Sequence, residues 1–458
     1  GSWRTSDRYA TFTEGEWALR DSDDAQIMAA AQQNDHHLAL DVSEYFIRQV
    51  QDDFAPFNLR APDVEPKVSD HISEIIELIQ NIVEKGFGYE VRGDVYFDVP
   101  AYHEKTGAYG KLSGRDYSQL MEGARVAPGT DKKNGVDFAL WKSAKPGEPS
   151  WESPWGKGRP GWHIECSVMS HKYLGEGFDI HGGGKDLIFP HHENEIAQAE
   201  GGYGATFARN WIHNGFVTVD GVKMSKSLGN FLSLADASKL ALPEVWRFMV
   251  LSVHYKSPID FSFTRQNEKG EVIRGTVDIA TERLQYFYKT LQRADDLLAG
   301  VEIDDSQPIL QPQIAGTLTD RLKEAMDDDF NTALALSHMG EAAKAINELA
   351  ALKPKQVRKI GEASVLYTLH VLQEEIRTAG RVLGLLERNP SDFLNELKYF
   401  LLQARNLDEA FIEAKLAQRH EAKTNKDFER ADAIRDELTA LNIVIGDLQG
   451  QSSWDIKI

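Results

Sequence analysis

Apolar residues recur at helical spacing in an early part of the chain. The stripe follows Asp70, a good helix cap, and ends before Lys85 and Gly86, a basic last turn and a stop. It consists of Ile72, Ile75, Ile76, Ile79, Ile82 and Val83. This spacing predicts an amphipathic helix over residues 72–83. Residues 94–99 then alternate polar and apolar side chains up to Pro100, which predicts a half-exposed strand.

The pattern changes further along the chain. Residues 106–158 are rich in Gly, Pro, Lys and Trp, and we expect an irregular insertion there. From about residue 176 to 230, short apolar runs alternate with glycine turns and a helical pattern, the order of βα units on a parallel sheet. Beyond about residue 275 helical stripes continue to Leu386, and the first contains Leu284, Phe287, Tyr288, Leu291, Leu297 and Leu298.

The last segment, residues 391–458, holds two helical patterns and a short apolar strand at 443–445. Basic residues recur there every three or four positions, at Lys415, Arg419, Lys423, Lys426 and Arg430. A basic stripe on one helix face could follow a nucleic-acid backbone. Because Glu413, Glu421, Asp427 and Glu429 are interleaved, a salt-bridged surface helix is an equal alternative.

Composition narrows the class of protein. The chain has 458 residues, enough for several domains at roughly 100–200 residues each, and 41% hydrophobic with 27% charged residues indicates a globular protein. No apolar stretch is long enough for a membrane span, so we expect no membrane partner. The single cysteine, Cys166, excludes an intramolecular disulfide and favours a reducing, cytoplasmic location. The net charge of −20 argues against indiscriminate adhesion to nucleic acid.

Three residues form a candidate metal site. His191 and Glu195 are four positions apart just after Pro190, a good helix start, so their side chains are expected on one helix face. With Cys166 they make a thiolate, imidazole and carboxylate set, which zinc accepts. An inert buried thiol with a chance His-Glu pair is the alternative.

Two further motifs are candidates for binding phosphates or nucleotides. Residues 179–184 (Asp-Ile-His-Gly-Gly-Gly) join a short apolar strand to three glycines, where backbone can approach a ligand closely, or where the chain simply turns. Asp220-Gly221 is a hairpin signal, so Lys223-Met224-Ser225-Lys226-Ser227 should lie on an exposed loop just beyond it. Such a loop can place its lysine ammonium groups against a triphosphate. The alternative is a solvent-exposed loop without a binding role.

These motifs resemble one family in their order and spelling. Residues 223–227 match the KMSKS signature of class I aminoacyl-tRNA synthetases. The segments that look like cysteinyl-tRNA synthetase are 109–115 (YGKLSGR), 161–167 (GWHIECS), 178–184 (FDIHGGG), 189–195 (FPHHENE), 211–215 (WIHNG) and 325–332 (AMDDDFNT). The chain is therefore identified as a member of that family from about residue 60 to its C-terminus.

The resemblance implies roles for individual residues. Cys166, His191 and Glu195 would hold one zinc ion per chain, which binds the thiolate of the substrate cysteine. Trp162 would border the amino-acid pocket, and His181 with Gly182, Gly183 and Gly184 would line the adenylate. Lys223, Lys226 and His181 are the expected catalytic residues, with Lys226 the ATP ligand of the loop. His192 and Glu193 would support the zinc ligands or simply lie on the helix surface.

The resemblance also implies the architecture and the reaction. We expect an α/β fold with a Rossmann-type catalytic domain (1–90 and 159–220) interrupted by an insertion (91–158). A KMSKS and stem-contact region (221–280), a helical tRNA-binding bundle (281–390) and a small α/β anticodon-binding domain (391–458) would follow. The expected activity joins L-cysteine to the tRNA for cysteine, with ATP as substrate, accompanied by Mg²⁺.

Two departures leave alternatives open. The chain begins Gly1-Ser2 without Met, and the family's HIGH motif and a fourth, cysteine zinc ligand near the N-terminus do not occur in it. We expect either that a segment of a normal synthetase is missing or that the chain is a catalytically impaired tRNA-binding paralogue. A related ligase that joins cysteine to an amino-sugar inositol in mycothiol synthesis is disfavoured, because it lacks the long C-terminal region that residues 391–458 provide.

Overall fold

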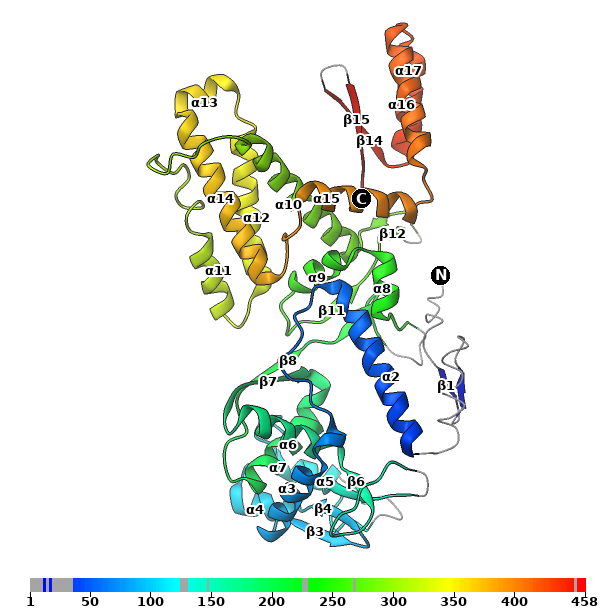
Figure 1. The fold of residues 1–458 in the computed structure, drawn as a ribbon, viewed down its shortest axis with the longest axis vertical. Coiled ribbons are helices and arrows are strands. Elements are labelled where there is room, and N and C mark those ends of the chain that lie inside the picture. The colour runs from blue at the N-terminus through cyan, green and yellow to red at the C-terminus, as the bar shows by residue number, and fades with distance from the viewer. Residues whose placement is uncertain are drawn as a thin grey trace. The chain divides into compact units, whose positions relative to one another are not determined.

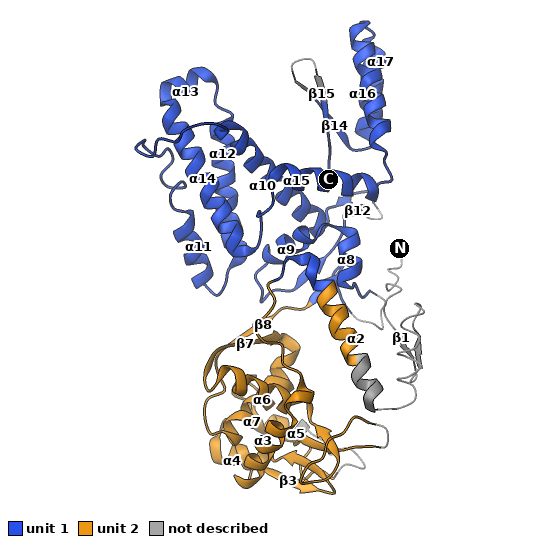
Figure 2. Ribbon diagram, in the orientation of Figure 1, with its two compact units in different colours: residues 1–4, 53–59, 217–458 blue, residues 5–52, 60–216 orange. Residues whose placement is uncertain are grey.

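Helix α3 (Ile72–Glu84) is labelled in Figure 1. It packs the stripe predicted for it into a hydrophobic core. Its N-cap residue is His71, which makes no side-chain capping bond, so the prediction that Asp70 caps it was wrong. The computed structural model describes residues 11–13, 16–18, 36–123, 131–145, 148–224, 230–266, 269–448 and 451–458. Two compact units are distinguished in Figure 2: residues 5–52 with 60–216, and residues 1–4, 53–59 and 217–458.

The first unit contains a four-stranded antiparallel sheet. Its order is β3 (Gly88–Val91), β4 (Asp94–Phe97), β5 (Phe138–Ser143) and β6 (Gly158–Pro160). The predicted strand thus ends at Phe97, because Val99 and Pro100 begin helix α4 (Val99–Thr106), which is capped by the Asp98 carboxylate. Pro fits this position because the first turn of a helix needs no N–H from it.

The expectation of an irregular insertion over residues 106–158 was wrong in part. Helix α5 (Tyr117–Gly123) and strand β5 lie inside it, and strand β6 begins at its last residue. Strand β5 pairs with β4 in the register Phe97↔Phe138 and Val95↔Trp141, far apart in sequence. The apolar run of β5 is too short to predict a strand by itself, and it forms a strand because it pairs with β4.

The parallel pairing predicted for the glycine-rich region is confirmed. Strand β7 (Phe178–Gly184) pairs with β8 (Ala208–Asn214) in parallel, and the connection contains helix α7 (Glu193–Gly202). Helix α6 (Trp162–Leu174) packs beside α7, and the buried Ser167 hydroxyl donates to Gln198 Oε1 at 2.8 Å. The three glycines belong to strand β7 and do not form a tight turn.

The second unit begins with the predicted hairpin. Strands β9 (Val217–Val219) and β10 (Val222–Lys223) are joined by Asp220 and Gly221, whose φ angles of 52° and 75° suit a two-residue turn. Strand β11 (Ile259–Phe261) pairs with β9 in parallel. The other short elements here are α8 (Leu234–Leu240), α9 (Pro243–Leu251), β12 (Arg265–Gln266) and β13 (Val272–Ile273).

A helical region follows, as the stripes predict. It comprises α10 (Thr276–Leu298), α11 (Leu318–Asp327), α12 (Thr332–Ala350), α13 (Pro354–Ile360), α14 (Glu362–Leu383) and α15 (Pro390–Ala404). The α10 stripe is buried from Leu284 to Leu291, whereas Leu297 is exposed. Helix α15 joins this core, since the buried Phe393 ring stacks on Tyr288 with centroids 3.9 Å apart.

The C-terminal segment differs from its prediction. Besides α15 it has α16 (Glu409–Thr424), α17 (Phe428–Ala440) and a hairpin of β14 (Ile443–Leu448) and β15 (Gln451–Ile456). The basic residues do not share one helix face, because the chain turns between α16 and α17 and Arg419 is buried. The N-terminal pieces are β1 (Thr11–Thr13), β2 (Glu16–Ala18) and α2 (His36–Phe54). None of the described helices combines the length and apolar character of a membrane span.

Candidate active site and metal centre

Helix α6 carries Trp162 and Cys166 and is held against strand β5. Gly161 precedes the helix and donates its N–H to the Leu140 carbonyl at 2.8 Å. A Cβ on Gly161 would lie 2.0 Å from the Ala139 carbonyl oxygen, so only glycine allows this approach. This backbone contact therefore fixes the start of α6 against β5, and with it the positions of the α6 side chains.

The three predicted metal ligands meet between α6 and α7. The ligand atoms of Cys166, His191 and Glu195 all lie within 4.8 Å of one another. His191 and Glu195 do project together, with Nε2 and Oε1 2.9 Å apart, as the four-residue spacing predicts. Glu195 is fully buried, His191 nearly so, and Cys166 partly buried.

A second group of histidines shares the same carboxylate. His181, at the middle of β7, places Nε2 2.9 Å from Glu195 Oε2, and with His192 it forms another set within 4.8 Å. The imidazole of His181 faces Glu195, and the expectation that His181 lines the adenylate stays a prediction. His192 and Glu193 are each 1% exposed, so the alternative that they lie on the helix surface was wrong.

Burial dominates the electrostatics of this cluster. It raises the pKa of the Cys166 thiol to about 12, and the neighbouring carboxylates of Glu195 and Glu165 add to the rise. Burial would also raise the pKa of Glu195, but the imidazoles of His181 and His191 outweigh it and hold the pKa near 2. The cluster therefore contains a buried carboxylate beside a neutral thiol.

The donor set fits a divalent cation. Although two imidazole nitrogens lie 2.9 Å from the Glu195 oxygens, neither contact has hydrogen-bond geometry, and both oxygens are buried without such a partner. A cation between these atoms would satisfy the carboxylate and favour the thiolate form of Cys166. Sulfur, imidazole nitrogen and carboxylate oxygen are ligand types that zinc accepts.

Two residues outside the predicted set complete the surroundings. His163 Nδ1 lies 2.9 Å from His191 Nδ1, so one imidazole donates to the other. Burial lowers the pKa of His163 to about 4, with His191 a further cause, so His163 is neutral at neutral pH. His213 contacts His192 in the same way, at 2.8 Å. His163 and His213 have no sequence spacing that predicts their contacts with His191 and His192. The only signal in the sequence is that both are histidines within the motifs.

Trp162 lies over the cluster and faces solvent. Its ring centroid is 4.4 Å from that of His191, and 59% of the residue is exposed. It can therefore form one wall of a site above His191, as expected for a residue bordering the amino-acid pocket.

The glycines of β7 leave room for close packing. A Cβ on Gly183 would lie 2.9 Å from the His192 ring, and one on Gly184 would lie 2.4 Å from Asp186 Oδ1. Gly183 thus lets the strand approach His192, whereas Gly182 is exposed and presents bare backbone. The structure gives these glycines a packing role that the sequence motif alone did not reveal.

The lysine loop belongs to the second unit. Lys223 is exposed on β10, opposite Thr218. Lys226, the expected ATP ligand, lies outside the described residues.

The chain matches two family models. Residues 18–269 match the "tRNA synthetases class I (C) catalytic domain", and residues 321–387 match the "DALR domain". It is 45% identical over 414 residues to a protein of Syntrophotalea carbinolica called "Cysteine--tRNA ligase", covering 90% of this chain and 81% of that protein. A protein of the same name from Geobacter sulfurreducens is 44% identical, covering 91% and 82%.

Solved structures show the same fold at low identity. The structure of Mycobacterium tuberculosis methionyl-tRNA synthetase in complex with methionyl-adenylate superimposes with a TM-score of 0.54. The two sequences are 18% identical, and the match covers 81% of this chain and 82% of that one. This likeness supports the α/β synthetase fold predicted above.

Proposed function

Because the chain belongs to the cysteine--tRNA ligase family of class I tRNA synthetases, we propose that it activates L-cysteine with ATP and transfers the cysteinyl group to tRNA. Identity of 42–45% to relatives of that name, over most of the chain, carries this conclusion. The DALR domain at residues 321–387 supports tRNA as the partner. On the free thiol of Cys166 we also propose a reducing, cytoplasmic location.

Cys166, His191 and Glu195 are the residues that would hold a zinc ion in this function. Zinc bound there would accept the substrate thiolate and disfavour the neutral hydroxyl of serine, a distinction that pocket shape makes poorly. The converging donor atoms and the buried carboxylate of Glu195, which faces imidazole nitrogens of His181 and His191, support this assignment.

The neighbouring residues would orient the substrate. Trp162 would cover the amino acid from the solvent side, and His181 would hold Glu195 in place from strand β7. The backbone at Gly182–Gly184 would lie along the adenylate, where the exposed Gly182 has no side chain to interfere. Positioning of this kind can supply a large part of the rate enhancement without a covalent enzyme intermediate.

Lys223 and Lys226 would act on the phosphates of ATP, which would bind together with Mg²⁺. Charge develops on the phosphates as pyrophosphate leaves, and a lysine ammonium placed against it stabilises the transition state more than the ground state. Lys223 is exposed on strand β10, where a ligand can reach it, and this supports the role proposed for it.

Two half-reactions test the proposal. Purified protein should catalyse cysteine-dependent exchange of pyrophosphate into ATP and should charge the tRNA for cysteine. Serine in place of cysteine serves as the matched control and should support little exchange. Protein that binds the tRNA but shows no exchange would instead be an impaired tRNA-binding paralogue.

A further inference from the structure

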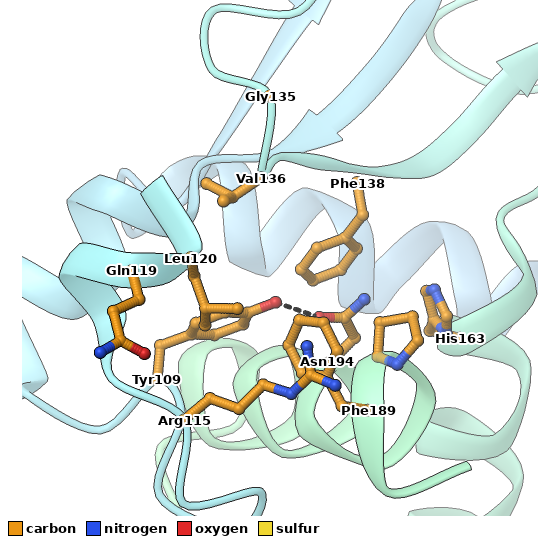
Figure 3. Close-up of a pocket in the computed structure, with 11 residues that line it drawn as sticks. Tyr109, Arg115, Gln119, Leu120, Gly135, Val136, Phe138, His163, Phe189 and Asn194 are labelled. Carbon is orange, nitrogen blue, oxygen red and sulfur yellow. Dashed lines mark hydrogen bonds between the residues drawn. The ribbon is translucent and has the colours of Figure 1, made fainter. Parts of the chain in front are cut away.

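A pocket of about 450 Å³ opens beside the start of helix α7 (Figure 3). Aromatic and amide side chains line it, together with one arginine: Tyr109, Arg115, Phe138, His163, Phe189 and Asn194. Its volume lies in the range of sites for small ligands or single ligand groups, about 300–1,000 Å³. None of the roles proposed above uses it.

The loop that forms one wall is held by two buried side chains of α7. The Glu193 carboxylate accepts the backbone N–H of Gly110 through Oε1 and that of Ser113 through Oε2, both at 2.9 Å. The Tyr109 hydroxyl donates to Asn194 Oδ1 at 2.7 Å, the dashed line in Figure 3. The loop 109–115 is therefore fixed to the helix that carries Glu195.

This anchoring presents Arg115 in a defined place. Its guanidinium lies over the Phe189 ring, 4.2 Å from the centroid, and the two overlap in Figure 3. Arg115 is exposed, so the far face of the guanidinium plane is available for stacking. A cation on an aromatic ring is a stacking surface prepared before any ligand arrives.

The chemistry of the lining favours an anionic ligand with a flat ring. Among the residues that the structure describes, no carboxylate lines the pocket, although the chain carries a net charge of −20. The carboxylates nearby are already engaged, Glu193 with the loop and Asp137 with Tyr89 and Asn134. Proteins commonly recognise unpaired nucleobases by stacking them on aromatic rings or arginine planes and bonding their edges with amides.

The position of the pocket favours the end of a tRNA over a free nucleotide. His163 lines the pocket, and its Nδ1 lies 2.9 Å from Nδ1 of His191, a candidate zinc ligand. One pair of imidazoles thus separates the pocket from the place proposed for the substrate cysteine. The unpaired 3′ end of the tRNA must come to that place to accept the cysteinyl group.

We propose that this pocket receives an unpaired nucleobase from the 3′ end of the tRNA, stacked on the Arg115–Phe189 pair with the Asn194 and Gln119 amides at hand for its edge. The proposal rests on the proposed function and identifies where the protein would bind the 3′ end of its tRNA.

Binding of two tRNA forms tests the proposal. The full chain is titrated against fluorescently labelled tRNA for cysteine, either complete or lacking its unpaired 3′-terminal nucleotides, without ATP or cysteine. Arg115→Ala should weaken binding of the complete tRNA roughly 5- to 100-fold, the size of one lost base stack. It should change binding of the shortened tRNA less than about twofold, because the contact is already absent there.

Two further variants separate stacking from charge. Arg115→Lys keeps the charge but loses the plane, so it should behave like Arg115→Ala. Lys111→Ala removes a cation from the same loop without altering the pocket lining, and it should affect both tRNA forms equally.

Three results would overturn the proposal. Equal losses on both tRNA forms for Arg115→Ala would place its contact elsewhere on the tRNA. Full binding by Arg115→Lys would show that charge alone matters. Loss of cysteine-dependent pyrophosphate exchange in Arg115→Ala would assign the pocket to cysteine activation. Because tRNA binding needs no activation step, an inactive wild-type protein would contradict the proposed function while leaving this test decisive.

Discussion

Glu195 connects the two histidine groups at the candidate metal centre. One oxygen faces His191 and the other faces His181, so a cation could be held on either side of the carboxylate. Only the first group contains a thiol, and Cys166 is the single cysteine of the chain. The two candidate ligand groups have similar burial and similar distances between ligand atoms. The thiol of Cys166 is the feature that distinguishes them.

Cys166→Ser is expected to remove most of the zinc that copurifies with the protein, at about one ion per chain, because a serine hydroxyl is a poor zinc ligand. His192→Ala belongs to the other histidine group and should leave the zinc content nearly unchanged. Elemental analysis of the purified proteins measures both. Unchanged zinc in Cys166→Ser with loss in His192→Ala would place the ion between His181, His192 and Glu195.

Lys226→Ala should slow cysteine-dependent pyrophosphate exchange roughly 10²- to 10³-fold, as removal of one group that stabilises transition-state charge does elsewhere. The zinc content and the thermal unfolding temperature should not change, because Lys226 is not a candidate zinc ligand and lysines are rarely part of a protein core. Lys239→Ala is a suitable control, since that exposed lysine pairs with Asp236 on helix α8. Exchange within twofold of wild type for Lys226→Ala would show that the loop is only surface.

At the scale of elements, α6 depends on how closely it can approach β5. Gly161 allows that approach, and Ser167 then bonds to Gln198 of α7. His191 lies in the turn directly before α7, so the spacing between α6 and this segment sets the distance from Cys166 to His191. Backbone packing at one glycine is therefore coupled to the geometry of the candidate metal centre.

Gly161→Ala should destabilise the protein by about 1–3 kcal/mol, because the added Cβ meets a backbone carbonyl that cannot rotate away. It should also weaken zinc binding by displacing Cys166. Gly340→Ala, on helix α12 with no atom near its Cβ, should instead be neutral or stabilising by up to about 1 kcal/mol. Denaturant unfolding and zinc content check both variants. Wild-type stability and zinc content in Gly161→Ala would contradict the packing argument.

At the scale of the whole molecule, the C-terminal elements have a separate small core. Leu416, Ile434, Leu438 and Ile443 pack there, whereas Phe393 of α15 belongs to the core of the helical region. A deletion that spares the helical region must therefore begin after α15, since cutting at residue 391 would remove the ring stacked on Tyr288.

Removal of residues 408–458 should keep cysteine activation within about twofold and weaken binding of the tRNA roughly tenfold. Activation residues are proposed in other parts of the chain, and the deleted segment belongs to the region that the resemblance assigns to anticodon binding. Affinity of the intact protein should fall steeply with salt, as neutralisation of phosphates requires. Pyrophosphate exchange and tRNA titration measure the two effects, and equal loss of both would mean that the segment is only structural.

Local patterns along the chain determined several features correctly. The period of the Ile72–Val83 stripe predicts α3, Asp220-Gly221 predicts its hairpin, and the spacing of His191 and Glu195 predicts that they project together. Each of these depends on residues within a few positions of one another, where backbone geometry alone relates the side chains.

Contacts between distant segments were decided only by the tertiary structure. Strand β5 exists because β4 pairs with it. For His192 and Glu193 the sequence left open a supporting role or a place on the helix surface, and they are buried because β7 and the loop 109–115 cover them. The meeting of His163 with His191 and of His181 with Glu195 likewise has no sequence period. The sequence motifs suggest that Cys166 lies near His191 and Glu195. Only the packing of α6 on α7 brings its sulfur to them, because side chains far apart in sequence meet only where packed elements place them.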